Sequence, residues 1–196
     1  MRPAVKPGAR PAARPALRHE VRLIGGRLKR SKLPVADRPG LRPTPDRVRE
    51  TLFNWLGQDL AGWRVLDAFA GSGALGFEAA SRGAAQVLLL EQDAVLVASL
   101  QRSQQRLQAG ALRVERADAM GWMARCAPRC FELVLIDPPF DSGLAAAAAA
   151  AAARLLVEGG FLYLEAPAPL DAPSGLAPWR SARAGAVSAQ LFVARA

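Results

Sequence analysis

From Trp63 onward, short apolar runs alternate with segments of helical periodicity, a pattern typical of a parallel sheet with crossover helices. The strands it predicts are Val65 to Phe69, Gln86 to Glu91, Leu112 to Arg116, Phe131 to Ile136 and Phe161 to Glu165. The helices it predicts between them are approximately Ala74 to Ser81, Ala94 to Ala109, Met120 to Arg125 and Leu144 to Leu156. Trp179 to Ala184 and Val187 to Ala194 have no helix between them and predict a hairpin that turns at Gly185. The pattern therefore predicts an α/β fold with a mostly parallel, doubly wound sheet and an antiparallel C-terminal hairpin.

The part of the chain before Trp63 follows a different pattern. Glu20 to Ile24 alternates polar and apolar residues as a short strand does. The basic segment Arg27 to Pro43 contains enough proline and glycine to predict an extended, irregular conformation. Thr44 then stands at the N-cap position, and Pro45 at the first position, of a helix that continues for about three turns.

Positive charge is concentrated at the start of the chain. The first fifty of the 196 residues include fourteen Lys or Arg and four Asp or Glu, which leaves twelve basic and thirteen acidic residues for the remainder. Prolines at every fourth position predict a disordered basic arm over residues 1–18. We expect the strand, basic loop and helix to occupy residues 19–62 and the main domain residues 63–196. A basic front end on a near-neutral body is typical of a protein that binds a polyanion such as nucleic acid.

Several kinds of chemistry lack the residues they need. His19 is the sole histidine and lies in the polar N-terminal region, so Ser-His and Cys-His catalysis have no base in the main domain. Cys126 and Cys130 lack the further ligands that a tetrahedral zinc site requires, and we predict no metal. The apolar run Leu144 to Ala153 is well short of the ~20 residues that span a bilayer. We expect a cytoplasmic protein with no membrane partner.

A glycine-rich turn follows the first strand of the main domain. It reads Asp67-Ala68-Phe69-Ala70-Gly71-Ser72-Gly73-Ala74-Leu75-Gly76. Gly71 and Gly73 allow the backbone to approach a ligand closely, and Asp67 can accept hydrogen bonds from a cationic or amino group. Because the same glycines also satisfy the dinucleotide pattern G-x-G-x-x-G, the turn predicts a cofactor site without distinguishing methyl transfer from hydride transfer.

Two more acidic residues end the next strands. Glu91, followed by Gln92, is placed to accept the ribose hydroxyls of a nucleoside cofactor, a demand common to NAD and S-adenosylmethionine. Asp118 could bind the N6 amino group of adenine while Ala119 leaves room for the ring. Aspartate also ends many strands for reasons of turn geometry, so the sequence alone leaves the role of Asp118 open.

The strand Phe131 to Ile136 leads directly into Asp137-Pro138-Pro139-Phe140. Two consecutive prolines fix the backbone and hold its carbonyl oxygens in a rigid array. If the Asp137 carboxylate and the Pro138 carbonyl accept the hydrogens of a base amino group, its lone pair localises and becomes nucleophilic. Such catalysis needs positioning and electrostatic stabilisation. Phe140 adds a face on which an extruded base can stack.

These motifs carry a family resemblance. Asp-Pro-Pro-Phe after the fourth strand, together with Asp-x-Phe-x-Gly-x-Gly after the first, resembles methyltransferases that modify the amino groups of adenine or guanine. The segment Gly40-Leu41-Arg42-Pro43-Thr44-Pro45-Asp46-Arg47-Val48-Arg49-Glu50-Thr51-Leu52-Phe53-Asn54-Trp55-Leu56 is similar to the RsmD family, the bacterial 16S ribosomal RNA guanine-N2 methyltransferases. The resemblance runs from about Val21 to the C-terminus.

The resemblance implies a Rossmann-like class I methyltransferase that uses S-adenosylmethionine to methylate guanine 966 (ribosomal RNA numbering) in the assembling small subunit. It implies that the cofactor is bound by Asp67, Phe69, Ala70, Gly71, Gly73, Glu91, Gln92, Asp118 and Ala119, and that the base enters at Asp137, Pro138, Pro139 and Phe140. The residues expected to contact RNA are Arg22, Arg27, Lys29, Arg30, Lys32, Arg42, Thr44, Arg47 and Arg49. We expect a monomer.

Three alternatives stay open. An N6-adenine methyltransferase acting on DNA or RNA would share Asp-Pro-Pro-Phe, although so short a chain has no room for an additional target-recognition domain. An NAD-dependent oxidoreductase would share the glycine turn and Glu91, but Tyr163 is the only tyrosine and falls within a predicted strand. A basic RNA-binding module without catalysis would leave Asp137 to Phe140 unexplained.

Overall fold

The computed structural model describes residues 19–36, 38 and 44–195. The predicted arm, residues 1–18, and the predicted RNA contact Arg42 lie outside the described residues. The strands are β1 (His19–Arg22), β2 (Lys32–Val35), β3 (Arg64–Asp67), β4 (Gln86–Glu91), β5 (Leu112–Arg116), β6 (Phe131–Ile136), β7 (Leu156–Ala166), β8 (Leu176–Ala184) and β9 (Val187–Ala194). The helices are α1 (Asp46–Trp55), α2 (Ala74–Ser81), α3 (Ala94–Arg106), α4 (Ala119–Arg125) and α5 (Ala145–Ala153), with a short 3-10 helix at Phe140–Ser142.

The main sheet has seven strands in the order β5-β4-β3-β6-β7-β9-β8. The five strands from β5 to β7 are parallel, whereas β9 pairs antiparallel with both β7 and β8. The chain builds outward from β3 to β5 and then crosses back to add β6 on the other side of β3. Ligands bind at the carboxyl ends of the strands at such a switch point. The predicted mostly parallel sheet with an antiparallel C-terminal hairpin is confirmed.

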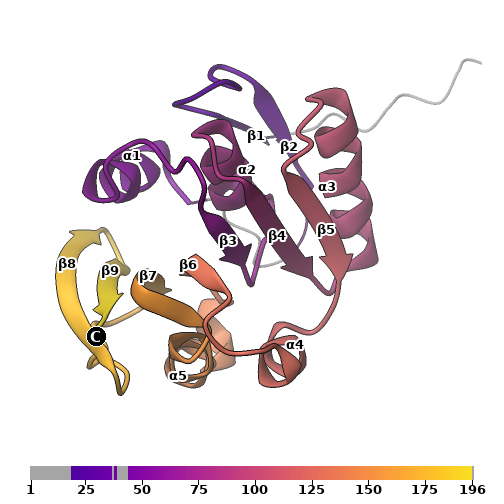
Figure 1. Cartoon of the computed structure of the whole chain (residues 1–196). Coiled ribbons are helices and arrows are strands. Elements are labelled where there is room, and N and C mark those ends of the chain that lie inside the picture. The colour runs from indigo at the N-terminus through magenta and orange to yellow at the C-terminus, as the bar shows by residue number, and fades with distance from the viewer. Residues whose placement is uncertain (1–18, 37, 39–43, 196) are drawn as a thin grey trace, which may run out of the picture.

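Helices cover both faces of this sheet (Figure 1). On one face Phe77 of α2 packs with Leu135 of β6 in a buried cluster that also includes α1 and the β1–β2 hairpin. On the other face Met123 of α4 and Ala148 of α5 pack with Val134. Consecutive residues of β6 belong to different clusters because alternate side chains of a strand face opposite sides. The fourth predicted strand is therefore central to both layers of the core.

The predicted bounds hold best in the middle of the domain. The bounds of β4, β5, β6 and α2 are those predicted from the sequence. β7 begins at Leu156, five residues before its predicted start, because the strand passes through an irregularity in its pairing with β6. Gly159 adopts a φ of 73° within it, a conformation that favours glycine.

A strand missing from the sequence prediction lies in the basic segment. β2 pairs antiparallel with β1 to form a separate two-stranded sheet. Pro34, within β2, is tolerated because an edge strand can lose one N–H donor. The loop after β1 docks on α2, where the Glu78 carboxylate accepts the N–H groups of Ile24 and Gly25 at 2.9 and 2.7 Å. The irregular conformation predicted for residues 27–43 is therefore wrong at β2.

The start of α1 also differs from its prediction. Pro45 is the N-cap residue and Asp46 the first helical residue, one position later than expected. The Thr44 side chain does not cap the helix. Its hydroxyl group instead donates to the Asp137 carboxylate, 93 residues away in the sequence, at 3.3 Å. Arg49, which was expected to contact RNA, is fully buried. The predicted α1 is confirmed as a helix, with Val48 and Arg49 buried against the protein and Asp46 and Arg47 exposed.

We expect Glu78→Ala to destabilise the fold strongly. The Glu78 side chain is fully buried and ion-paired with Arg82, itself 5% exposed, at 2.8 Å. Its removal leaves a buried guanidinium group and two backbone N–H groups without their acceptor, which costs about 3 to 5 kcal/mol. Chemical denaturation measures the loss. Glu20→Ala is the control, because the Glu20–Lys32 pair is exposed and worth at most about 1 kcal/mol. Equal losses in the two variants would contradict a structural role for Glu78.

Candidate active site

Four carboxylates lie at one edge of the sheet. Asp67 and Glu91 end β3 and β4, Asp118 comes two residues after β5, and Asp137 follows β6 directly. These strands are parallel neighbours in the order β5-β4-β3-β6. Their carboxyl ends therefore share an edge, and the structure brings together the four strand ends that the sequence singled out.

The glycine turn between β3 and α2 leaves little space for side chains. Gly71 and Gly73 have φ values of 52° and 79°, in the left-handed region. A Cβ at Gly73 would lie 2.5 Å from a methyl carbon of Leu100. The Asp67 carboxylate accepts the Gly76 N–H at 2.9 Å, which ties the end of β3 to the first turn of α2. Backbone at Gly71 and Ser72 stays partly exposed, so a ligand can approach it closely.

The buried carboxyl group of Asp67 has a raised pKa. Burial raises its pKa to about 7, the Gly76 N–H lowers it, and the charges of Glu91 and Glu165 raise it further. A cationic group bound nearby would favour the ionised carboxylate and offset its desolvation. The amino group of a methionine-type cofactor has this charge, so the environment of Asp67 fits such a ligand.

Glu91 holds the glycine turn from the neighbouring strand. One carboxylate oxygen accepts the Gly71 N–H at 3.0 Å and the other accepts the Asp93 N–H at 2.8 Å. The side chain is partly exposed and Gln92 beside it is exposed. Because each carboxylate oxygen can accept more than one hydrogen bond, Glu91 can support the turn and still bind ligand hydroxyls.

Asp118 has a local structural role in addition to the predicted one. Its carboxylate accepts the Gly121 N–H at 2.7 Å as the N-cap of α4. The residue is exposed at the mouth of the edge, and Ala119 is buried behind it. Adenine binding by this pair stays a prediction.

Asp137 is followed by a stiff and partly open segment. Pro138 is buried, whereas Pro139 is exposed. Phe140 begins the 3-10 helix and is 41% exposed, unusual for so large an apolar side chain. A planar ring presented to solvent beside a carboxylate can stack on a nucleobase. Burial raises the pKa of Asp137 well above its ordinary value, and the neighbouring charges of Glu165 and Asp67 raise it further.

Two buried residues of β7 complete the surroundings of Asp137 and were missed from the sequence. Leu164 pairs with Ile136, so Glu165 lies beside Asp137 in the same register. The Tyr163 hydroxyl group donates to Glu165 at 2.9 Å, and both side chains are buried. Burial raises the pKa of Glu165. The only available signal was an acid at the end of a predicted strand.

A buried guanidinium group links this site to the N-terminal elements. Arg49 donates to the carbonyl oxygens of Thr44 and Arg22 at 2.8 and 2.7 Å, and to Asp46 at 2.9 Å. Thr44 is itself only 5% exposed. Both residues were expected to contact RNA. The structure corrects these two expectations, because the side chains are engaged inside the protein and shape the wall of the site.

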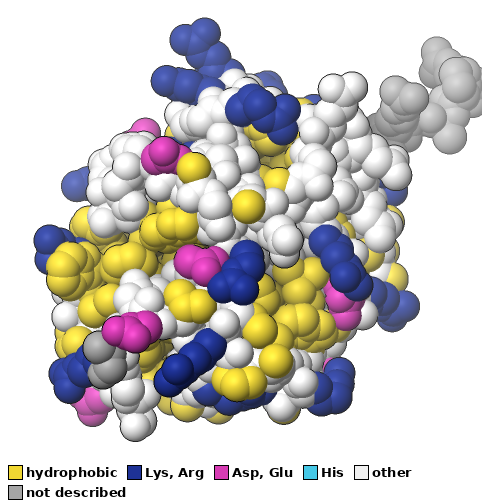
Figure 2. Space-filling view, in the orientation of Figure 1, with side chains coloured by type: hydrophobic (Ala, Val, Ile, Leu, Met, Phe, Trp, Pro, Cys, Tyr) yellow, Lys and Arg dark blue, Asp and Glu magenta, His cyan; other side chains and the backbone are white. Residues whose placement is uncertain are grey.

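The other predicted RNA contacts lie in two places. Arg22, Arg27, Lys29, Arg30 and Lys32 are exposed on the β1–β2 hairpin, and Figure 2 shows basic side chains projecting over it. The turn of this hairpin docks at Ser81, the last residue of α2. That position is one helix length, about 12 Å, from the glycine turn. Arg47 is exposed on the first turn of α1, next to Thr44 and the site.

The described residues offer neither a metal site nor a membrane-spanning helix. No group of three or more His, Cys, Asp or Glu side chains is placed to hold a metal ion there. In the same part of the chain, no helix is long and apolar enough to cross a membrane.

The strand order, the glycine turn and the Asp-Pro-Pro-Phe segment at the switch point define a Rossmann-like class I methyltransferase fold. The solved structure of yhhF from Escherichia coli, provisionally assigned as a methyltransferase, matches with a TM-score of 0.81 at 39% identity, covering 91% of this chain and 99% of that one. A provisionally assigned methylase from Haemophilus influenzae matches with a TM-score of 0.76 at 33% identity, covering 91% and 100%.

Sequence relatives narrow the class to a family. Ribosomal RNA small subunit methyltransferase D of Escherichia coli K12 is 41% identical over 182 residues, which cover 88% of this chain and 89% of the relative. The protein of the same name from Haemophilus influenzae is 37% identical, with coverages of 88% and 93%. A family model described as "Conserved hypothetical protein 95" matches residues 21–193. The chain belongs to this family, that of the RsmD methyltransferases, which confirms the resemblance seen in the sequence.

We expect Asp67→Asn to stabilise the ligand-free protein in a pH-dependent way. The pKa of Asp67 is raised to about 7 from 3.8, so folding favours the protonated carboxyl group. That contribution to stability is complete below about pH 4 and is lost as the pH rises to about 7. The variant should therefore match the wild type near pH 4 and exceed it at pH 7 by on the order of 4 kcal/mol. Chemical denaturation across this range measures the difference.

Asp118→Asn is the matched control for this prediction. It makes the same substitution at an exposed carboxylate that also accepts a backbone N–H, at 2.7 Å. Its stability should run parallel to that of the wild type over the same pH range. A pH-dependent gain of equal size at both positions, or none at Asp67, would show that burial of Asp67 is not the cause.

Proposed function

We propose that this protein methylates the exocyclic N2 amino group of a guanine in 16S ribosomal RNA, within the assembling small subunit, using S-adenosylmethionine. The observation that carries the proposal is the position of Asp137 to Phe140 beside the glycine turn at the switch point. The names of the relatives support ribosomal RNA of the small subunit as the substrate. The family resemblance supports guanine 966 as the target, and we expect the protein to act as a cytoplasmic monomer.

The residues around the glycine turn suit S-adenosylmethionine, which supplies a methyl group bonded to a positively charged sulfur. Asp67 and the backbone of residues 69–73 would hold its methionine part, and the charge of the amino group would offset the desolvation of Asp67. Glu91 and Gln92 would bind the ribose, while Asp118 and Ala119 would bind the adenine. These assignments follow the order of the strand ends across the sheet.

Asp137 and Pro138 would activate the target amine. A guanine amino group is a weak nucleophile because its lone pair is delocalised into the ring. Hydrogen bonds from its two hydrogens to the Asp137 carboxylate and the Pro138 carbonyl oxygen localise that lone pair. The raised pKa of Asp137 also makes its carboxylate a stronger base, able to take the proton that the methylated nitrogen releases. Phe140 would stack on the extruded base.

The structure weakens the oxidoreductase alternative. Hydride transfer needs a proton donor or acceptor next to the substrate, and Tyr163 was the only tyrosine available for that role. Its side chain is buried and its hydroxyl group donates to Glu165. Methylation of adenine N6 uses the same Asp-Pro-Pro-Phe chemistry, and the experiment below distinguishes it.

The decisive experiment identifies the methylated nucleoside. Wild-type protein is incubated with S-adenosylmethionine labelled in the methyl group and with small ribosomal subunits that lack the modification, and the RNA is then digested and mapped. We expect label in N2-methylguanosine at a single position, and less label with deproteinised 16S RNA. Label in N6-methyladenosine, or none in RNA, would refute the proposal.

We expect Asp137→Ala to lower the turnover number by at least about 100-fold, the typical cost of removing one electrostatic group from an active site. Affinity for S-adenosylhomocysteine, measured by calorimetry, should stay within about twofold because Asp137 serves the amine rather than the cofactor. Asp141→Ala is the control, because it also removes a carboxyl group. Asp141 is exposed and lies four residues after Asp137. Full turnover in the Asp137 variant would contradict the mechanism.

A further inference from the structure

A groove separates α1 from the tip of the β8–β9 hairpin. It encloses about 240 Å³. Arg47 and Thr51 line it from α1, while Arg183, Gly185 and Ala189 line it from the hairpin. Figure 1 shows the hairpin tip next to α1, although these elements are more than a hundred residues apart in the sequence. Small residues on the hairpin side keep the groove open.

The groove lies beside the candidate active site. Ala189 of β9 pairs with Glu165 of β7, and Glu165 is the neighbour of Asp137 at the end of β6. Two strand spacings, about 10 Å, therefore separate the groove from Asp137. On the other wall α1 begins two residues after Thr44, whose hydroxyl group donates to Asp137. A strand of RNA whose base reaches Asp137 would thus pass close to the groove.

The two arginines on opposite walls are exposed and available to a ligand. Neither Arg47 nor Arg183 forms a salt bridge within the described part of the chain, unlike Arg38 and Arg113, which pair with carboxylates. The Arg183 Nε donates to the Gly185 carbonyl oxygen at 3.2 Å. This bond uses only the Nε–H, which leaves the two terminal amino groups of the guanidinium for an anion. Arginine binds phosphate oxygens in this manner.

We propose that this groove binds the sugar–phosphate backbone of the RNA strand next to the methylated nucleotide. The inference rests on the proposed function, and it adds the C-terminal hairpin to the RNA-binding surface expected at the N-terminus. Phosphate contacts fix the register and orientation of a nucleic acid without reading its sequence. The groove therefore orients the strand so that the extruded base enters between Asp137 and Phe140.

A salt titration tests the groove directly. Deproteinised 16S ribosomal RNA is the probe, and filter binding measures its association constant over a range of salt concentrations. Each lost phosphate contact lowers the slope of log K against log salt by about 0.7 to 0.9. We expect this decrease for Arg183→Ala and for Arg47→Ala. We also expect either change to raise the KM for small subunits several-fold while leaving the affinity for S-adenosylhomocysteine unchanged.

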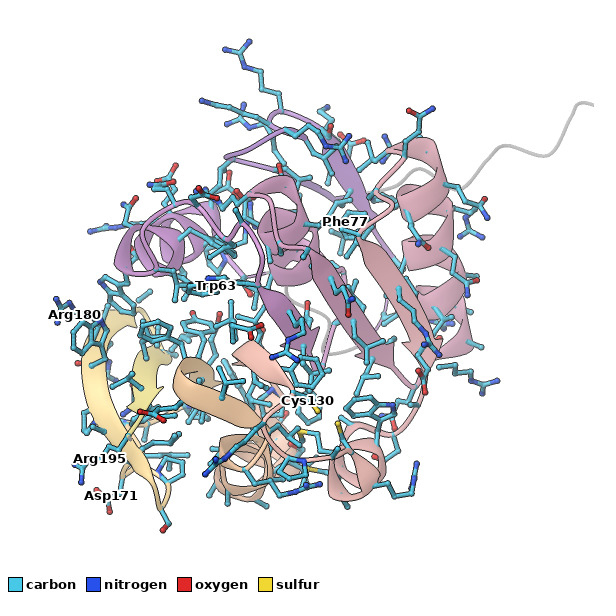
Figure 3. All side chains as sticks on the ribbon, in the orientation of Figure 1. Trp63, Phe77, Cys130, Asp171, Arg180 and Arg195 are labelled. Carbon is cyan, nitrogen blue, oxygen red and sulfur yellow. The ribbon has the colours of Figure 1, made fainter. Side chains whose placement is uncertain are left out.

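Arg195→Ala is the matched control. Arg195 is exposed on the same hairpin but at its other end, where its N–H donates to the Gly175 carbonyl oxygen (Figure 3). The slope of log K against log salt for this variant should equal that of the wild type. An unchanged slope for Arg183→Ala, or an equal decrease for Arg195→Ala, would overturn the proposal that the groove binds RNA. A higher KM for small subunits with an unchanged slope would also overturn it, in favour of a protein contact. The nucleoside map of the wild type tests the proposed function separately.

Discussion

The parallel pairing of β3 with β6 is the constraint on which the site depends. Asp67 pairs with Leu135, and the Ala68 N–H donates to the Leu135 carbonyl oxygen at 3.1 Å. This pairing sets the glycine turn and Asp137 side by side although seventy residues of sequence separate Asp67 from Asp137. The shared edge of the candidate site therefore follows from strand order, before any side chain is placed.

The edge concentrates negative charge with little to balance it. Asp67, Asp137 and Glu165 each have a raised pKa because burial disfavours their charged forms. For Asp67 and Asp137 the negative charge of Glu165 raises the pKa further. The positive charge of buried Arg49 lowers the pKa of Glu165. Its guanidinium group donates its hydrogen bonds to backbone carbonyl oxygens and to Asp46. A site with this balance favours ligands that bring positive charge or hydrogen-bond donors. A sulfonium cofactor and a base amino group are both of that kind.

The sequence predicted the parallel core well because buried strands are continuous apolar runs bounded by clear turns. β4, β5 and β6 fall into this category. The features that the sequence did not predict share a physical cause. Arg49 looked like a surface residue because its acceptors, the carbonyls of Arg22 and Thr44, are not visible in helical periodicity. β2 was hidden by Pro34, and Thr44 resembled an N-cap because its partner Asp137 is 93 residues away. Local patterns find elements, whereas long-range polar contacts need the fold.

The docking of the β1–β2 hairpin on α2 has a consequence for synthesis of the chain. The hairpin leaves the ribosome first, yet the acceptors for Ile24, Gly25 and Leu28 belong to Glu78 and Ser81, more than fifty residues later. Contacts of such sequence separation form late because the intervening loop must close first. During translation the basic segment therefore waits undocked until α2 has emerged. Its net positive charge opposes aggregation of the nascent chain during that interval.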